Sequence, residues 1–394
     1  MNDDSRRLIA LSVYHCINDG SLALFASALP VMRLALGLDF LQIGTILSLG
    51  LVATMLLQLL FGFLSDRGYA SQALVLGFAG IVVVDLAFPI SSVFMQVLVF
   101  YVLLRSAAAV YHPVSFASIG RTYAENKTAA FGYQGAIGDV GLTAATFSTG
   151  ILSEMWGWQI PFWVWGGLGM ILFLYFASVI IRHRIGFYAQ PATSVAEFNS
   201  NQRNPRSLGS AFAIIAIVSS LTTVTFILFT GYIPLYFNVV EGLSPSSSTT
   251  IVAAWIGIGV FAGLMTGRIV GRCGGEAKAL QMTFAIQAFL LLIANAALSS
   301  DRLVPSGLTV GYVTMVLTGI PVFITFPAVN GLLGLMMPHR RLGLTYAVNL
   351  SLGLMVASVT AYLTGYLASM MSIAIILPIL LIVAILGAVS SFAL

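Results

Sequence analysis

The chain has 394 residues, of which 59% are hydrophobic and only 8% are charged. A soluble protein of this length would need far more charged residues to cover its surface, so this composition excludes a soluble globular protein. The formal net charge is +4. In a chain made mostly of apolar runs this charge reflects basic loops and does not indicate nucleic-acid binding. Apolar runs of about 20 residues, the length that crosses a bilayer core, recur from end to end. The sequence therefore predicts a polytopic, all-α membrane protein.

Twelve transmembrane helices are predicted in two halves of six. The N-terminal half covers residues 1–181 and the C-terminal half covers residues 209–394, and residues 182–208 between them are predicted to be a cytoplasmic linker because they are rich in Pro, Ser, Asn and Arg. The seventh and tenth spans contain internal prolines, which a helix tolerates where it lines a cavity. The predicted spans are residues 8–32, 41–64, 72–92, 95–119, 129–153, 159–181, 209–238, 250–270, 278–299, 306–335, 343–368 and 372–392.

The positions of the basic residues predict the orientation. If the N-terminus is inside, the inner loops collect most of the Lys and Arg residues and the outer side receives only Arg33 and Arg302. The positive-inside rule then places both termini in the cytoplasm. We expect a monomer in a lipid bilayer, namely the inner membrane of a prokaryote.

The first span contains the segment YHCINDG, which places His15 and Asp19 four residues apart on one helix face. Ionisable groups at membrane depth are costly, so each one is a candidate functional residue. A rise of about 1.5 Å per residue puts Asp19 near the middle of the membrane and His15 about one turn closer to the cytoplasm. By the same estimate, His112 lies at the level of His15. Arg105 and Asp139 lie at the level of Asp19.

These five side chains are predicted to form one buried charge network. Two carboxylates need about one compensating cation to stay ionised in a low dielectric. Arg105 supplies a permanent cation, whereas a histidine supplies one only when it is protonated. Such a network can couple a conformational change to the binding and release of protons. The alternative is a static network that only holds the helices together.

The two halves resemble each other in sequence. The segment GFLSDRGYASQAL, residues 62–74, follows the second span, and GRIVGRCGGEAKAL, residues 267–280, follows the eighth. Gly62 matches Gly267 and Arg67 matches Arg272. Parallel six-helix repeats place a substrate site near the midplane, between the halves.

Twelve spans, a central cytoplasmic linker and the motif GFLSDRG together resemble the major facilitator superfamily. Gly62, Leu64, Asp66 and Arg67 fit its signature between helices 2 and 3, although the spacing to Gly68 is one residue short and the basic tail is missing. The resemblance implies two six-helix bundles with helices 1, 4, 7 and 10 around a central cavity. We interpret Gly62, Asp66 and Arg67 as a conformational latch on the cytoplasmic side.

A narrower resemblance is to the fosmidomycin-resistance branch of that superfamily. Val114 stands where this branch has a glutamate, and Arg105 stands where it tends to have a small residue. The residues that match are His15, Asn18, Asp19, Gln42, Ile43, Gly44, His112 and Pro113.

The cavity helices that the resemblance implies give a set of candidate substrate contacts. The N-terminal wall should be charged, because the ionisable residues lie in that half, and the C-terminal wall should be aromatic and lined by amides. The candidates are Tyr14, Asn18, Tyr111, Tyr232, Tyr236, Asn238, Phe326, Asn330 and Asn349.

The predicted function is secondary active transport by alternating access, through proton-coupled efflux of a small organic molecule. The sequence lacks an ATP-binding loop, and the direction of transport follows from the branch resemblance alone. The alternative is a transporter of a metal ion, a metal chelate or an organic anion, in either direction. A membrane-embedded enzyme or a sensor is a third hypothesis, but no nucleophile–base spacing supports it. We expect no resident metal or cofactor.

Overall fold

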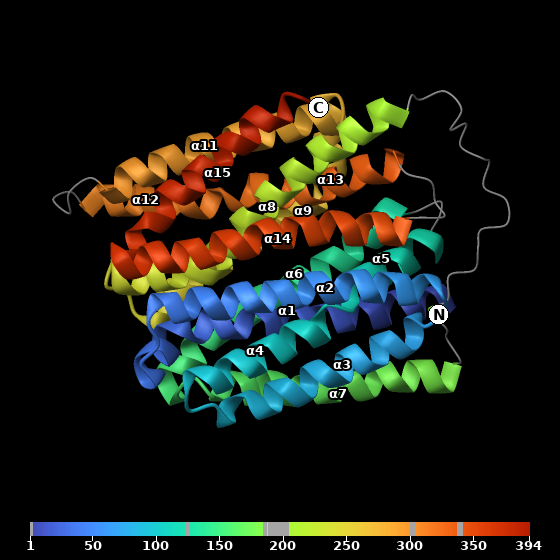
Figure 1. Ribbon diagram of the computed structural model, residues 1–394, viewed down its shortest axis with the longest axis horizontal. Helices are drawn as coiled ribbons and strands as arrows, with labels where there is room; N and C mark the ends of the chain where they lie inside the picture. The colour runs from blue at the N-terminus through green and yellow to red at the C-terminus, as the bar shows by residue number, and fades with distance from the viewer. Residues whose placement is uncertain (1–2, 123–126, 184–186, 188–204, 300–304, 337–341) are drawn as a thin grey trace.

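The computed structural model describes residues 3–122, 127–183, 187, 205–299, 305–336 and 342–394, and in these ranges the chain forms helices and no β-strand. Figure 1 shows the helices side by side in two bundles, with α1 to α7 in one and α8 to α15 in the other. The first bundle consists of α1 (Asp3–Leu36), α2 (Phe40–Asp66), α3 (Ala70–Ala87), η1 (Phe88–Ile90), α4 (Phe94–Ala108), α5 (Tyr111–Thr122), α6 (Lys127–Trp156) and α7 (Ile160–His183). The second consists of α8 (Pro205–Val239), α9 (Pro245–Leu264), α10 (Thr266–Cys273), α11 (Glu276–Ser299), α12 (Pro305–Leu317), α13 (Gly319–Met336), α14 (Leu342–Met370), η4 (Ile373–Ile375) and α15 (Ile376–Ser391).

Eleven helical segments in the described part of the chain are long and apolar enough to cross a membrane. They overlap eleven of the predicted spans, and the eighth span, predicted at residues 250–270, lies instead at Pro245–Leu264. The remaining predicted span, residues 129–153, forms α6, which has 30 residues but also carries Gln134, Asp139 and Glu154. The count of twelve membrane crossings therefore stays a prediction. Most of the predicted linker, residues 182–208, lies outside the described residues.

Proline explains two helix breaks. A proline lacks the N–H that would bond to the carbonyl four residues earlier, so a helix tends to end there. The break between α4 and α5 precedes Pro113 by this spacing, and the break between α12 and α13 precedes Pro321. In contrast, α8 and α13 continue through Pro234 and Pro327. The fourth and tenth predicted spans are thus each built from two helices.

The two bundles meet through α1, α2 and α6 on one side and α8, α9 and α14 on the other. Where α2 begins and α14 ends, Gly44 and Gly365 pack backbone to backbone, and a side chain at either position would collide with the other helix. At the same end, the Glu154 carboxylate of α6 accepts a hydrogen bond of 2.8 Å from the backbone N–H of Ser246 in α9. The halves are therefore held together at this end.

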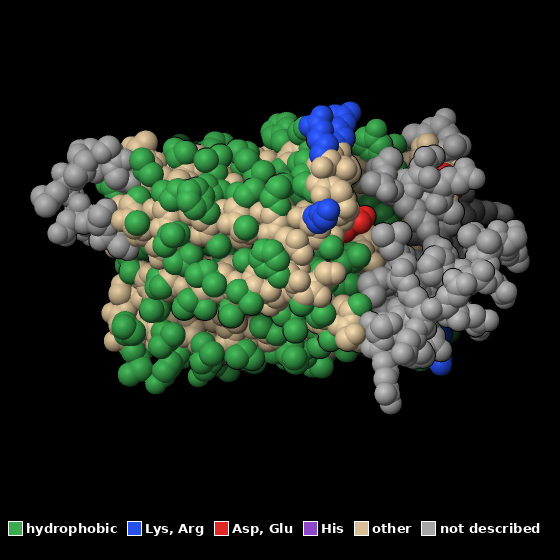
Figure 2. All heavy atoms as spheres, turned by 90° about the horizontal axis from the view of Figure 1, so that it is seen from above, with side chains coloured by type: hydrophobic (Ala, Val, Ile, Leu, Met, Phe, Trp, Pro, Cys, Tyr) green, Lys and Arg blue, Asp and Glu red, His purple; other side chains and the backbone are tan. Residues whose placement is uncertain are grey.

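The outer surface of the bundles is apolar. Figure 2 shows a broad band of hydrophobic side chains, with Lys, Arg, Asp and Glu near only one end of the visible face. Large side chains are well exposed, with 72% for Leu76, 66% for Ile171 and 72% for Phe261. Such a surface is compatible with lipid and not with water, because a soluble protein exposes apolar groups only in small patches. The chain is an all-α membrane protein.

Candidate functional site

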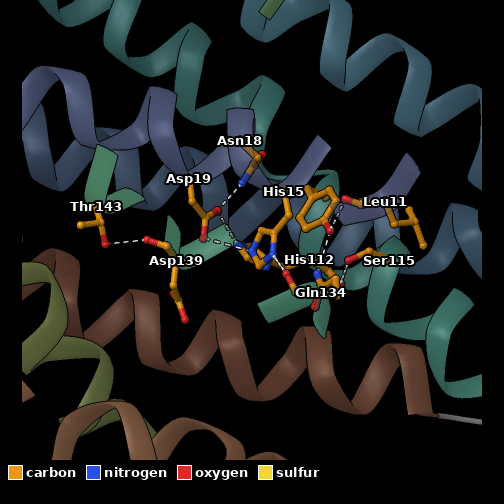
Figure 3. A network of polar contacts seen from close by, with 10 residues as sticks. Leu11, His15, Asn18, Asp19, His112, Ser115, Gln134, Asp139 and Thr143 are labelled. Carbon is orange, nitrogen blue, oxygen red and sulfur yellow. Dashed lines mark hydrogen bonds and ion pairs between the residues drawn. The ribbon is translucent and has the colours of Figure 1, made fainter. Parts of the chain in front are cut away.

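Two histidines and an aspartate meet inside the N-terminal bundle. His15 Nε2 lies 3.0 Å from Asp19 Oδ2, and His112 Nε2 lies 3.5 Å from Asp19 Oδ1. His15 and Asp19 share a face of α1 because they are one turn apart, and α5 presents His112 to the same carboxylate (Figure 3). The structure thus brings together three of the five residues predicted to form the charge network. We call His15, Asp19 and His112 the histidine–aspartate cluster.

Hydrogen bonding fixes the ring of His15. Its Nδ1 lies 2.8 Å from the backbone carbonyl oxygen of Gln134 in α6. A carbonyl can only accept, so Nδ1 carries a proton and donates it. The opposite nitrogen, Nε2, faces the Asp19 carboxylate at 3.0 Å, although it is not aligned for a linear hydrogen bond. A bare lone pair would be repelled there, so the His15–Asp19 contact requires one further proton, on either partner.

Neighbouring polar groups hold the cluster in place. The Tyr111 hydroxyl donates to the Leu11 carbonyl at 2.8 Å and accepts from Gln134 Nε2 at 2.7 Å. The Tyr111 ring also stacks on the His15 ring, with centroids 4.7 Å apart. Asn18 Nδ2 donates to Asp19 Oδ1 at 2.8 Å. These contacts join α1, α5 and α6 and leave His15 little freedom to rotate.

Glycines in α6 make room for this arrangement. A Cβ atom at Gly138 would lie 2.2 Å from His15 Nδ1, and one at Gly141 would lie 2.2 Å from the Cys16 carbonyl oxygen. A Cβ at Gly135, one turn earlier, would meet nothing within 4 Å. The small residues of the segment GAIGDVG therefore let α6 approach α1 closely, and Gly138 makes space for the imidazole.

The cluster is enclosed but not sealed. The side chain of His15 is 6% exposed, that of Asp19 is 17% exposed and that of His112 is 27% exposed. Each of the three residues offers one potential ligand atom, and these three atoms lie within 4.8 Å of one another. Imidazole nitrogens and a carboxylate are ligands for zinc and related ions. The cluster could therefore hold a proton or a divalent metal.

Asp139 lies beside the cluster without joining it. Within the described residues no ion pair forms at its carboxylate, and Figure 3 shows this side chain directed away from Asp19. Its backbone carbonyl accepts a hydrogen bond from Thr143 at 2.7 Å. Asp139 is half-buried, and the charges of His15 and Asp19 act on its carboxylate without contacting it.

The prediction that Arg105 completes the network is not met in this structure. The Arg105 Nε donates to the Thr54 hydroxyl of α2 at 3.1 Å, and the described carboxylates all lie outside ion-pair distance of its guanidinium. The depth estimate gave the level of Arg105 in the membrane but not its rotation about the helix axis. That rotation turns the side chain toward α2, and the two histidines take the place predicted for it beside Asp19.

The three N-terminal cavity candidates have different surroundings. Asn18 and Tyr111 support the cluster, as described. Tyr14 stacks on Phe78 of α3, with centroids 4.4 Å apart, and its edge meets Phe176 of α7. Neighbouring residues of a helix point about 100° apart, so Tyr14 turns away from the face that carries His15. It is a core residue of the bundle and does not line a central cavity.

Three of the C-terminal candidates lie near the end of α8. The Tyr232 hydroxyl donates to the Ala361 carbonyl at 2.6 Å. The Tyr236 hydroxyl bonds to Glu241 at 2.7 Å, and Asn238 Nδ2 bonds to the Leu243 carbonyl at 2.8 Å. Tyr236 and Asn238 therefore fasten the loop after α8, and the prediction that they line a cavity at mid-membrane is not supported.

The remaining C-terminal candidates lie on α13 and α14, and two of them contact α8. Phe326 meets Phe226 edge to face, and the Asn330 backbone carbonyl accepts from Tyr346 at 3.2 Å. Asn349 Nδ2 donates to Ser219 at 2.9 Å, and its buried Oδ1 has no hydrogen-bond partner among the described residues. No contact in the described part of the chain joins them into one site.

The predicted latch is only partly described. Gly62 is buried in α2, and the guanidinium of Arg67 lies 4.1 Å above the Phe63 ring. The Asp66 side chain lies outside the described residues. A role for these residues in the access cycle therefore stays a prediction. Two residues of the branch resemblance have structural roles: Gln42 forms a capping box with Asp39 at the start of α2, and Gly44 packs against α14.

Sequence reasoning missed several residues of the site. Gln134 contributes its backbone carbonyl to His15, and a backbone group gives no sequence signal. Thr54, the partner of Arg105, looks like any small polar residue in an apolar run.

Away from the cluster, the hydroxyl of Ser21 donates to the fully buried carboxyl of Asp85, whose other oxygen has no partner in the described ranges.

The sequence profile of the Major Facilitator Superfamily matches residues 11–361. No curated protein matches the chain significantly. Among solved structures, a bacterial homologue of the human lysosomal transporter Spinster, in an inward-facing and occupied conformation, is similar with a TM-score of 0.75 at 14% identity, covering 100% of this chain and 97% of that one. The nucleoside transporter NupG is similar with a TM-score of 0.67 at 14% identity, covering 100% of this chain and 98% of that one.

Proposed function

Because the chain belongs to the Major Facilitator Superfamily, we propose that it is a secondary active transporter whose histidine–aspartate cluster couples the movement of a small organic molecule to protons. The family and the fold of its structural neighbours point to a transporter rather than an enzyme. Transport in such folds occurs by alternating access, in which one bundle moves against the other around a central site.

The observation that carries the coupling proposal is the contact between His15 and Asp19. Nδ1 of His15 donates to a backbone carbonyl, and Nε2 faces a carboxylate, so the pair holds one exchangeable proton. Removing that proton leaves a lone pair against a carboxylate in a nearly buried position, which is unfavourable in a low dielectric. Loss of the proton therefore favours a rearrangement of α1 against α6.

The direction of transport and the orientation are parts of the same proposal. Resemblance to the fosmidomycin-resistance branch supports efflux by antiport with protons. Arg6, Arg7 and Arg67 lie at the end of the bundle where α1 begins and α2 ends, which supports a cytoplasmic location for that end. The end closed by Gly44 and Gly365 would then face outward. We further propose that the protein works as a monomer in a prokaryotic inner membrane.

The test is transport by purified protein in proteoliposomes. A substrate screen with and without an imposed pH gradient identifies a molecule whose flux follows the gradient. Asp19→Asn should abolish gradient-driven flux and leave folding and some substrate exchange intact, because asparagine mimics the protonated acid. Asp139→Asn is the matched control, since its carboxylate makes no ion pair with a described residue. Wild-type rate and pH dependence in Asp19→Asn would refute the coupling role.

A metal ion or metal chelate is the second candidate substrate, and the geometry of the cluster supports it. His15, Asp19 and His112 supply three ligand atoms within 4.8 Å of one another. The Nδ1–H of His15 bonds to a carbonyl, an arrangement that orients histidine ligands in many metal sites. Accumulation or loss of zinc or manganese in the same proteoliposomes, blocked by His112→Gln, would favour this candidate over proton coupling.

A further inference from the structure

Arg105 is a buried cation deep in the N-terminal bundle. It lies in the last turn of α4, eleven residues after Phe94, so a rise of about 1.5 Å per residue places it roughly 17 Å from the start of the helix. The bilayer core is about 30 Å thick, so this position is near its middle. The residue is only 6% exposed.

The partners of Arg105 do not neutralise its charge. The Nε group bonds to the Thr54 hydroxyl, and that hydroxyl lies within hydrogen-bond distance of the carbonyls of Gly50 and of Arg105 itself. Within the described residues, no carboxylate lies within 4 Å of the guanidinium, and no acceptor bonds to its two terminal nitrogens. Asp19, the carboxylate predicted to pair with it, is already shared by two histidines.

A charge in this position requires an anion. A buried ion without a partner costs several kcal/mol. The C-terminal end of α4 offers a partial compensation equivalent to roughly half an elementary charge. The remaining charge, together with four N–H donors of a planar fork, matches a carboxylate, phosphonate or sulfonate, which a guanidinium can bind through two parallel hydrogen bonds.

Two buried aromatic side chains lie next to Arg105. Tyr101 is one turn before Arg105 on α4, and both side chains pack over Gly50 of α2, where a Cβ would lie 2.4 Å from the Tyr101 ring and 2.8 Å from Arg105 Cγ. Phe25 of α1 contacts Tyr101, with ring centroids 4.4 Å apart. Tyr101 is 4% exposed and Phe25 is fully buried, so Arg105 lies among packed apolar side chains.

We propose that Arg105 binds the anionic group of the transported molecule, so that the substrate is a small organic anion. This inference rests on the proposed transport function and adds the class of substrate to it. Thr54 is a positioning residue, because its hydroxyl accepts a hydrogen bond from Nε and thereby fixes the guanidinium beside α2. The histidine–aspartate cluster, on α1 and α5, is a separate element from this anion site.

The experiment measures binding and does not depend on transport. Purified protein in detergent is titrated with benzoate and phenylphosphonate, with benzylamine as the cationic analogue and benzyl alcohol as the neutral one. Binding is followed by calorimetry and by thermal stabilisation. We expect the two anions to bind and Arg105→Gln to weaken them at least tenfold. Arg33→Gln is the matched control, since Arg33 lies at the far end of α1 over the Phe40 ring, and it should bind like the wild type.

Two further variants keep the test decisive. Arg105→Lys preserves the charge and tests the site even if the glutamine variant does not fold, and it should weaken the binding of both anions because the bidentate hydrogen bonding is lost. Asp19→Asn should keep anion binding, so failure of proton coupling and failure of the anion site can be told apart. The proposal is overturned if neither anion binds better than benzylamine or benzyl alcohol, or if Arg105→Gln or Arg105→Lys binds both anions like the wild type.

Discussion

Replacing Gly138 by alanine tests whether the position of the His15 ring matters. The added Cβ would lie 2.2 Å from His15 Nδ1 and 2.3 Å from Cε1, whereas ordinary contacts begin near 3.4 Å. The ring must therefore move by roughly 1 Å to restore van der Waals contact. The hydrogen bond from Nδ1 to the Gln134 carbonyl, now 2.8 Å, would be lost or badly bent.

The expected magnitude follows from these contacts. Overpacking a close helix contact costs about 1–3 kcal/mol. Loss of the hydrogen bond adds about 1 kcal/mol. Alanine is favoured over glycine inside a helix by about 1 kcal/mol, which offsets part of this cost. Gly135→Ala is the matched control, because it has the same helix preference and would meet nothing within 4 Å. The two variants should thus differ in stability by about 2–4 kcal/mol.

The assay has a stability arm and a functional arm. Thermal unfolding in detergent should rank Gly135→Ala at or above the wild type and Gly138→Ala several degrees below it. Gradient-driven flux in proteoliposomes should fall about 10- to 100-fold in Gly138→Ala, since a shift of about 1 Å at a reacting group has an effect of that order. Equal flux and equal pH dependence in the two alanine variants would refute the reasoning that His15 must keep its position.

Two further predictions concern carboxylates outside the cluster. Hydrogen bonds from the Ser246 side chain and backbone hold the pKa of Glu154 below its ordinary value, so this contact is present at neutral pH and is lost as the pH falls through the lowered pKa. Spin labels at the ends of α6 and α9 should therefore report a wider distance in acid than at pH 7, and Glu154→Ala, which removes the acceptor, should show the wider distance at pH 7 as well; a wild-type distance that does not change on acidification would contradict this. Asp85, which bonds to Ser21 and has no ion-pair partner among the described residues, should tolerate asparagine with nearly wild-type gradient-driven flux, in contrast to Asp19; a loss as large as that of Asp19→Asn would show that Asp85 takes part in coupling.

Local properties of the sequence determined the elements of this protein. A run of about 20 apolar residues must form a helix in a bilayer, because unpaired backbone groups are too costly there. The helical repeat placed His15 and Asp19 on one face, and the missing N–H of Pro113 explains the break between α4 and α5. Each of these features depends on residues within one or two turns, so sequence alone suffices to predict it.

The partners of those residues depended on the tertiary structure. Position along the chain predicted a level in the membrane for Arg105 and His112, but helix rotation and the closeness of neighbouring helices decided that His112 meets Asp19 and that Arg105 meets Thr54. Successive side chains of a helix point about 100° apart around its axis. An estimate of depth therefore does not show which neighbouring helix a side chain faces. The approach of α6 to α1 at Gly138, and the backbone carbonyl that it presents to His15, arise only when the helices pack.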